Sequence, residues 1–186
     1  MADPARGGAV SGPPVGAVPD LATARLILRA LSPQGALDLL AGVTAPGRRW
    51  APDYPGQADV VAATAYLWAV EHVGELAPFG PYQLIGRADG VVIGGAGFRG
   101  PPVAGEVEIA YAVVPSARGR GYATEAVRAL VGLAAAAGVR SLSAVVAAGN
   151  PASARVARAA GLHLTRSEGA SWLFTREPMH PRGSDA

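Results

Sequence analysis

Residues 115–122 read Pro-Ser-Ala-Arg-Gly-Arg-Gly-Tyr, and they separate two segments that differ in hydrophobic periodicity. In residues 106–114, larger apolar side chains alternate with Glu or Ala, which is the period-two pattern of a β-strand. In residues 121–137, apolar side chains recur at helical spacing and no proline interrupts them. The sequence therefore predicts a strand, a glycine-bearing turn and a helix in direct succession.

Such a turn is typical of a phosphate-binding site. The start of a helix leaves backbone N–H groups unpaired, and the helix dipole favours an anion there. Gly119 and Gly121 allow the backbone to approach an anion closely, and Arg118 and Arg120 add positive charge. Residues 118–158 hold six arginines and one glutamate, whereas the whole chain has a net charge of only +2. A polyanion such as coenzyme A would suit this segment.

Two other phosphate-binding motifs are excluded. A Walker loop requires a lysine, and the chain contains none. Residues 95–100 match the dinucleotide pattern G-x-G-x-x-G, but Pro101 and Pro102 follow them, so this motif cannot open a helix.

Length and composition indicate one ordinary globular domain. We expect a disordered leader over residues 1–20, a single domain over 21–176 and a loose tail over 177–186. The longest apolar run is interrupted by glycines and is too short to span a bilayer, and the N-terminus lacks a signal-peptide pattern. The absence of cysteine excludes disulfides and a cysteine nucleophile. We therefore expect a cytoplasmic protein with no membrane partner.

The remaining elements are predicted from periodicity, caps and turn residues. Asp89-Gly90 is the strongest hairpin signal, Ser32 precedes a proline-started helix, and Asn150 is the expected N-cap of another. The predicted strands cover residues 25–31, 82–88, 91–98, 106–114, 142–147, 162–165 and 170–175, and the predicted helices cover 32–41, 58–73, 121–137 and 151–160. This order predicts an α+β fold with a mixed, mostly antiparallel central sheet flanked by helices.

Five motifs follow one another in a recognisable order: residues 23–29 (TARLILR), 108–111 (EIAY), 118–126 (RGRGYATEA), 150–153 (NPAS) and 160–162 (AGL). In these motifs and their order the chain resembles the GNAT superfamily of acetyl-CoA-dependent N-acetyltransferases. Within it, the chain is most similar to the branch of ribosomal-protein N-terminal acetyltransferases, the Rim-type enzymes. The resemblance implies the GNAT fold, acetyl-CoA as cosubstrate, no metal and an amine as acceptor.

The resemblance also implies which residues hold acetyl-CoA. The pyrophosphate would lie against Arg118, Gly119, Arg120, Gly121, Tyr122, Ala123 and Thr124. Asn150 and Ser153 would contact the pantetheine arm. The backbone N–H groups of Val113 and Val114, which we expect to be free where the strand splays from its neighbour, would hold the thioester.

The strand at 106–114 also carries the candidate general base. On one face, Glu106 and Glu108 precede Ala110 and Ala112, whose small side chains leave room for a ligand. A carboxylate beside that room could deprotonate an ammonium substrate, and the resemblance places the family's glutamate at Glu108. The alternative is that both glutamates simply face solvent. The tyrosine that is the general acid in many relatives corresponds to Ala157, and a thiol pKa of about 8.5 makes an unaided thiolate a fair leaving group.

The acceptor side is less specific. Trp50 and Tyr54, in a loop rich in Gly and Pro, are candidates for the acceptor pocket, whereas Trp68 is expected in the core. We predict transfer of an acetyl group to a primary amine of a protein N-terminus or a small molecule, by a monomer or homodimer. The alternatives are a catalytically silent CoA-binding domain and a basic RNA- or ribosome-associated module. No aromatic platform interleaves the arginines, which argues against nucleic acid.

Overall fold

The computed structural model describes residues 18–177. Most of the predicted leader and all of the predicted tail except Glu177 lie outside the described residues. The strands are β1 Leu21–Ala22, β2 Leu26–Ala30, β3 Arg49–Trp50, β4 Pro81–Gly86, β5 Val91–Phe98, β6 Glu106–Val113, β7 Ser141–Ala147, β8 His163–Glu168 and β9 Ser171–Arg176. The helices are α1 Pro33–Leu40, α2 Gln57–Val73, α3 Tyr122–Ala136 and α4 Pro151–Ala159, with a 3₁₀ turn at Pro115–Ala117.

These strands form one open sheet in the order β1-β2-β4-β5-β6-β7-β9-β8, and β3 pairs with β5 off this path. All neighbouring pairs are antiparallel except β3–β5 and β6–β7, which are parallel. A parallel pair requires a crossover connection, and α3 supplies it between β6 and β7. The predicted α+β fold with a mixed, mostly antiparallel sheet is confirmed.

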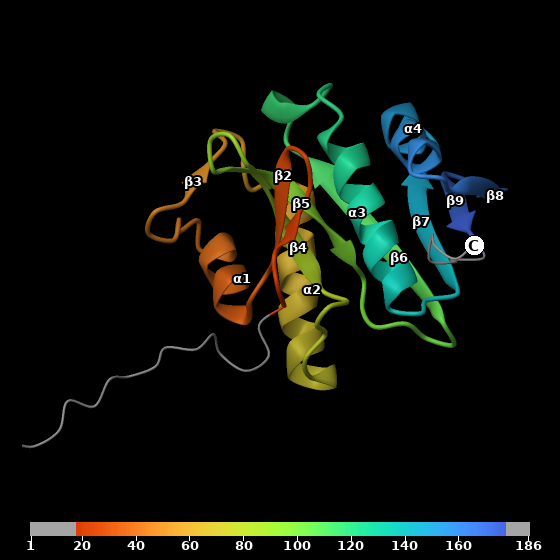
Figure 1. The fold of residues 1–186 in the computed structure, drawn as a ribbon, viewed down its shortest axis with the longest axis horizontal. Coiled ribbons are helices and arrows are strands. Elements are labelled where there is room, and N and C mark those ends of the chain that lie inside the picture. Colours follow the sequence, from red (N-terminus) through yellow and green to blue (C-terminus); the bar gives the residue numbers. More distant parts are fainter. Residues whose placement is uncertain (1–17, 178–186) are drawn as a thin grey trace, which may run out of the picture.

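Helices cover both faces of the sheet. α3 and α4 lie over one face, and α2 lies over the other (Figure 1). On β6, the alternation that the sequence predicts sends Val107, Ile109 and Val113 into the core, where α3 contributes Val127 and Leu130. The opposite face of β6, with Glu106, Glu108, Ala110 and Ala112, lies on the α2 side.

The parallel pair opens before the end of β6. β7 pairs with β6 only from Glu106 to Glu108, opposite Ser141 to Ser143. β7 then continues to Ala147 beside β9, whereas β6 continues to Val113 beside β5. The predicted splay is therefore present, and it lies directly before the glycine-bearing turn.

The glycine motif at residues 95–100 lies in β5 and in the turn after it. It does not open a helix, as the prolines that follow it predicted. Its neighbour Gly94 has φ of +153°, and a Cβ there would lie 2.2 Å from the Ala112 carbonyl oxygen. A Cβ at Gly97 would lie 2.5 Å from Cα of Pro81. These glycines let neighbouring backbone approach β5 closely.

One packing prediction was wrong. Trp68 is 60% exposed and stacks on His72, one helical turn later, with ring centroids 4.4 Å apart. α2 is alanine-rich and apolar on most sides, so periodicity did not identify its buried face. Within residues 18–177, every helix is too short or too polar to cross a lipid bilayer.

Candidate active site

The turn before α3 has the geometry that an anion site requires. Gly119 and Gly121 have φ of +76° and +78°, a conformation that residues with a Cβ rarely adopt. Gly121 is the N-cap of α3 and has no side chain to bond the first-turn N–H groups, which therefore stay available to a ligand. A Cβ at Gly121 would lie 3.4 Å from Nη2 of Arg25. The residues present thus fit a phosphate group of coenzyme A.

Arg25, the residue directly before β2, contacts this turn and holds it in place. Its Nε and Nη2 each lie 2.7 Å from Oε2 of Glu125, and its Nη1 donates to the Arg120 carbonyl at 2.8 Å. Its guanidinium also lies over the Tyr122 ring, 4.9 Å from the centroid. Sequence reasoning missed this role of Arg25, although the residue stands in one of the motifs that carry the resemblance.

Glu125 is the partner of Arg25 in this ion pair. Its Oε1 accepts hydrogen bonds from the Thr23 hydroxyl at 2.6 Å and from the Arg25 backbone N–H at 2.7 Å. Partial burial acts to raise the pKa of Glu125, but the hydrogen bonds from Thr23 and Arg25 outweigh it, so the pKa is lowered. Glu125 is therefore an ionised anchor for residues a hundred positions away.

A second set of hydrogen bonds joins the turn to the loop before α2. Asp53 accepts hydrogen bonds from the Ser116 hydroxyl at 2.5 Å and from its backbone N–H at 2.8 Å, which lower the pKa of Asp53. Arg118 folds back on β6, and its Nε donates to the Val113 carbonyl at 2.9 Å. The phosphate turn, the end of β6 and the loop that precedes α2 are thus held together.

Backbone hydrogen bonds decide which N–H groups face the splay. Val114 N–H donates to the Ile93 carbonyl at 3.0 Å, so the expectation that it is free was wrong. Residues of an antiparallel strand alternate in the direction of their hydrogen bonds, so Tyr111 and Val113 point their N–H groups away from β5. β7 no longer pairs with β6 at that level. The two backbone N–H groups at the splay are therefore those of Val113 and Tyr111. Sequence reasoning predicted the first and missed the second.

Asn150 and Ser153 lie on the other side of the splay, at the start of α4. Asn150 Oδ1 accepts the Ser153 backbone N–H at 3.0 Å, so Asn150 is the N-cap, as predicted. The Ser153 hydroxyl donates to the Tyr111 hydroxyl at 3.0 Å, and the Tyr111 hydroxyl donates to the Ser153 carbonyl at 2.8 Å. Tyr111 thus bridges β6 to α4. Ala157, one turn further along α4, is fully buried.

The two glutamates of β6 differ in their surroundings. Glu108 is paired with Arg99, with Oε1 2.7 Å from Nε, and a third of its side chain is exposed. Glu106 is exposed, at the far end of the strand from the splay. Both lie on the α2 face of the sheet. The solvent-facing interpretation fits Glu106 better than Glu108.

A cavity of about 440 Å³ lies on this face, between α2 and strands β4, β5 and β6. Tyr54 lines it and is 6% exposed, whereas Trp50 does not line it and instead packs edge-on against Tyr54, with ring centroids 5.3 Å apart. The Tyr54 hydroxyl accepts from Gln83 Nε2 at 3.1 Å, and Gln83 Oε1 accepts from Arg48 at 2.9 Å. Asp59 of α2 also lines the cavity, and sequence reasoning missed this residue.

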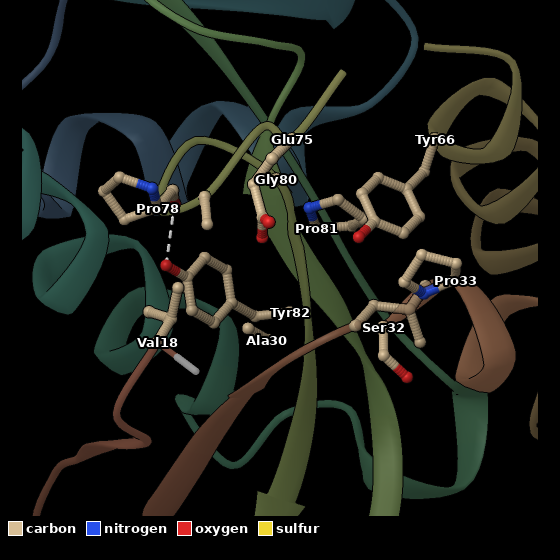
Figure 2. Close-up of a pocket in the computed structure, with 12 residues that line it drawn as sticks. Val18, Ala30, Ser32, Pro33, Tyr66, Glu75, Pro78, Gly80, Pro81 and Tyr82 are labelled. Atoms are coloured by element: carbon tan, nitrogen blue, oxygen red, sulfur yellow. Dashed lines mark hydrogen bonds between the residues drawn. The ribbon is translucent and has the colours of Figure 1, made fainter. Parts of the chain in front are cut away.

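A smaller cavity of about 210 Å³ adjoins the larger one and shares four wall residues with it: Leu31, Tyr66, Pro81 and Tyr82. Figure 2 shows the Tyr82 hydroxyl pointing at Pro78, to whose carbonyl it donates at 2.7 Å. Among the described residues that line the smaller cavity, the only carboxylate is that of Glu75, which is exposed. No group of three or more potential metal ligands occurs in residues 18–177.

Comparisons with known proteins find a matching family model and structures of similar fold. Residues 25–163 match the family model described as an acetyltransferase (GNAT) domain. An acetyltransferase structure from Agrobacterium tumefaciens is 25% identical, with a TM-score of 0.61, over 87% of this chain and 95% of that one. A structure described as a GNAT-family acetyltransferase from Bordetella pertussis is 26% identical, with a TM-score of 0.60, over 86% and 99% of the two chains.

RimL, a ribosomal L7/L12 α-N-protein acetyltransferase crystallised with coenzyme A, has the same fold. It is 16% identical, with a TM-score of 0.62, over 87% of this chain and 99% of that one. A comparison with curated proteins finds no significant match.

Proposed function

The chain belongs to the GNAT acetyltransferase family, and on that premise we propose that it transfers the acetyl group of acetyl-CoA to a primary amine. The acceptor is an amine of a protein N-terminus or of a small molecule, attacked directly without a covalent enzyme intermediate. The observation that carries the proposal is the position of the splay. It lies between the glycine-bearing turn of α3 and the cavity under α2.

Acetyl-CoA would supply an activated thioester, and the residues around the splay would bind and orient it. The first-turn N–H groups of α3, with Arg118 and Arg120, would hold the pyrophosphate over residues 118–124. Asn150 and Ser153 would border the pantetheine arm. The N–H groups of Val113 and Tyr111 would donate to the thioester carbonyl oxygen, where negative charge develops.

A carboxylate on the α2 side of the sheet would take the proton of the amine. Glu108, predicted from the sequence, stays a candidate because it lies on that face next to Arg99, which lines the cavity. Its Oε1 is paired with Arg99, so the proton would pass to Oε2, directly or through a water molecule. The departing thiolate needs no strong acid, since its conjugate thiol has a pKa of about 8.5.

We expect acetyl-CoA to stabilise the protein against unfolding. A ligand that binds only the folded state at 100 times its dissociation constant stabilises by about 2.7 kcal/mol. Thermal unfolding with and without millimolar acetyl-CoA measures this, and acetyl phosphate, which carries the acetyl group without the nucleotide, is the control. The absence of any shift with acetyl-CoA or CoA would contradict the proposal.

Mass spectrometry of amine acceptors incubated with acetyl-CoA separates an enzyme from the alternatives. Acetylated product supports the transferase. Binding of acetyl-CoA without product for any amine favours a silent CoA-binding domain, and salt-dependent RNA binding without CoA binding favours the basic module.

A further inference from the structure

Asp59 is a buried carboxylate that projects into the larger cavity. It is 6% exposed, although aspartate is among the residues least often buried without a partner. Its Oδ2 accepts the Gly56 backbone N–H at 2.9 Å and so caps the start of α2. Within residues 18–177, no other residue donates a hydrogen bond to Oδ1, and no cation lies at ion-pair distance from the carboxylate, whose further donor is its own backbone N–H.

Oδ1 keeps contact with the cavity. No side-chain oxygen of the described residues is both completely buried and without a hydrogen-bond partner, so Oδ1 is not sealed in the core. A buried carboxylate normally has a cationic or hydrogen-bonding partner, because loss of hydration otherwise destabilises it. The described part of the chain supplies no cationic partner for this carboxylate, and among its other residues only the Gly56 N–H donates to it, at Oδ2. Oδ1 receives no hydrogen bond from another described residue and is left for a ligand.

The position of Oδ1 relates Asp59 to the splay. A Cβ at Gly95 would lie 2.7 Å from Oδ1, so the carboxylate occupies space that only a glycine in β5 leaves open. Gly95 pairs across strands with Ala112, the residue between Tyr111 and Val113. Glu108 lies four residues earlier on β6, about 14 Å along the strand. Asp59 is therefore the carboxylate nearer to the N–H groups proposed to hold the thioester.

The lining of the cavity indicates the class of amine. Asp59 is the one carboxylate among the described residues that line it, and most of the wall is apolar, with Leu31, Leu39, Val61, Ala65, Leu76 and Phe98. Cavities of about 300–1,000 Å³ are typical of small-molecule sites. One anion in a mostly apolar, partly open cavity matches one ammonium on an apolar body, whereas a second ammonium would meet the apolar wall or the Arg99 guanidinium and would have no partner among the described lining residues.

We propose that Asp59 binds the ammonium of the acceptor and takes its proton, and that the acceptor is a small primary monoamine with an apolar body. This inference rests on the proposed transferase function. The ammonium gives one proton to the Asp59 carboxylate, and the nitrogen lone pair then forms the C–N bond to the acetyl carbon. The C–S bond breaks with its electron pair on sulfur, and the second nitrogen proton passes to the departing thiolate. Glu108 then serves to hold Arg99 at the cavity.

The charges that face Asp59 are compatible with this role. Burial raises the pKa of Asp59 to about 6, although the backbone N–H groups of Gly56 and of Asp59 itself act to lower it, so the carboxylate is ionised above neutral pH. Tyr54, from the loop before α2, stays neutral because burial raises its pKa further. Arg48 is hydrogen-bonded to Gln83 of β4, and Arg99, the residue directly after β5, is paired with Glu108 of β6. A base with a pKa near 6 suits catalysis at neutral pH.

The first experiment uses the wild-type protein and two amines of equal length, hexylamine and 1,6-diaminohexane, with acetyl-CoA. We expect kcat/KM to be at least about tenfold higher for hexylamine, because desolvating a second ammonium is unfavourable. A peptide with a free N-terminal alanine is the third acceptor. Equal or better acetylation of the diamine or of the peptide would overturn the assignment of the acceptor.

The second experiment compares Asp59→Asn with Glu108→Gln, and uses Glu106→Gln as the matched control. Asn can still accept the Gly56 N–H, so the cap is preserved. We expect Asp59→Asn to lower kcat/KM for hexylamine by about 10²-fold or more, and by more than Glu108→Gln does, with unchanged acetyl-CoA affinity. A larger loss in Glu108→Gln would return the role of base to Glu108.

The pH profile separates a base from a structural residue. In the wild type, kcat/KM for hexylamine should rise through about pH 6 and then level, whereas in Asp59→Asn it should keep rising toward the amine pKa of about 10.4. Parallel profiles would overturn the proposal. If acetyl-CoA fails to stabilise the wild type, the transferase function itself is refuted. If acetyl-CoA stabilises the protein but none of the three amines is acetylated, the proposed class of acceptor is refuted.

Discussion

Replacing Gly121 with aspartate is expected to lower the affinity for acetyl-CoA by at least about 100-fold, which corresponds to about 2.7 kcal/mol, while the protein stays folded. The new carboxylate would stand at the N-cap of α3, where the pyrophosphate is proposed to bind, and would repel it. Its Cβ would also fill the close approach that the glycine provides. Isothermal titration with acetyl-CoA measures the loss, and circular dichroism verifies the fold.

Two variants separate charge from shape in that experiment. Gly121→Asn has nearly the same size as the aspartate variant and also tolerates a positive φ, but it is neutral. Gly132→Asp places the same charge on the same helix at an exposed position with open space around it. We expect an intermediate loss of affinity for the asparagine variant and none for Gly132→Asp. An unchanged affinity in Gly121→Asp would place the phosphate site elsewhere.

Asp59→Asn is expected to stabilise the ligand-free protein at pH 8 by up to about 3 kcal/mol. The pKa of Asp59 is raised from 3.8 to about 6 in the folded protein, mainly by burial. Between these values the folded state binds more protons than the unfolded state, so wild-type stability falls as pH rises from about 4 to about 6. Asparagine removes the buried charge and retains the cap.

Urea unfolding of the wild type and of Asp59→Asn at pH 4 and pH 8 measures this difference. The two proteins should be similar in stability at pH 4 and should differ at pH 8, and the exposed Glu106→Gln variant should show no such dependence. A variant that is less stable than the wild type at pH 8 would mean that the carboxylate is stabilising, and that it has a partner. Such a result would also weaken the proposal that the Asp59 carboxylate is free to bind the ammonium of the substrate.

The sequence by itself determined those features whose causes lie within a few residues. The period-two strand before Pro115, the glycines at 119 and 121 and the helix after them are all present. The caps at Ser32 and Asn150 are also as predicted, because each requires only a side-chain oxygen and an N–H three residues later. The β4–β5 hairpin at Asp89-Gly90 is local in the same sense.

Only the tertiary structure decided the partners of these elements. Arg25 and Glu125 are a hundred residues apart, Tyr111 and Ser153 forty-two, and the bond that engages Val114 comes from the neighbouring strand. No pattern in α2 distinguishes Asp59, which is buried, from Trp68, which is exposed, since both stand in one alanine-rich helix. Asp59 lies against the sheet because Gly95, on another element, leaves room for its carboxylate. The glycine turn could therefore be read from the sequence, whereas the carboxylate proposed to receive the amine became visible only once the chain had folded.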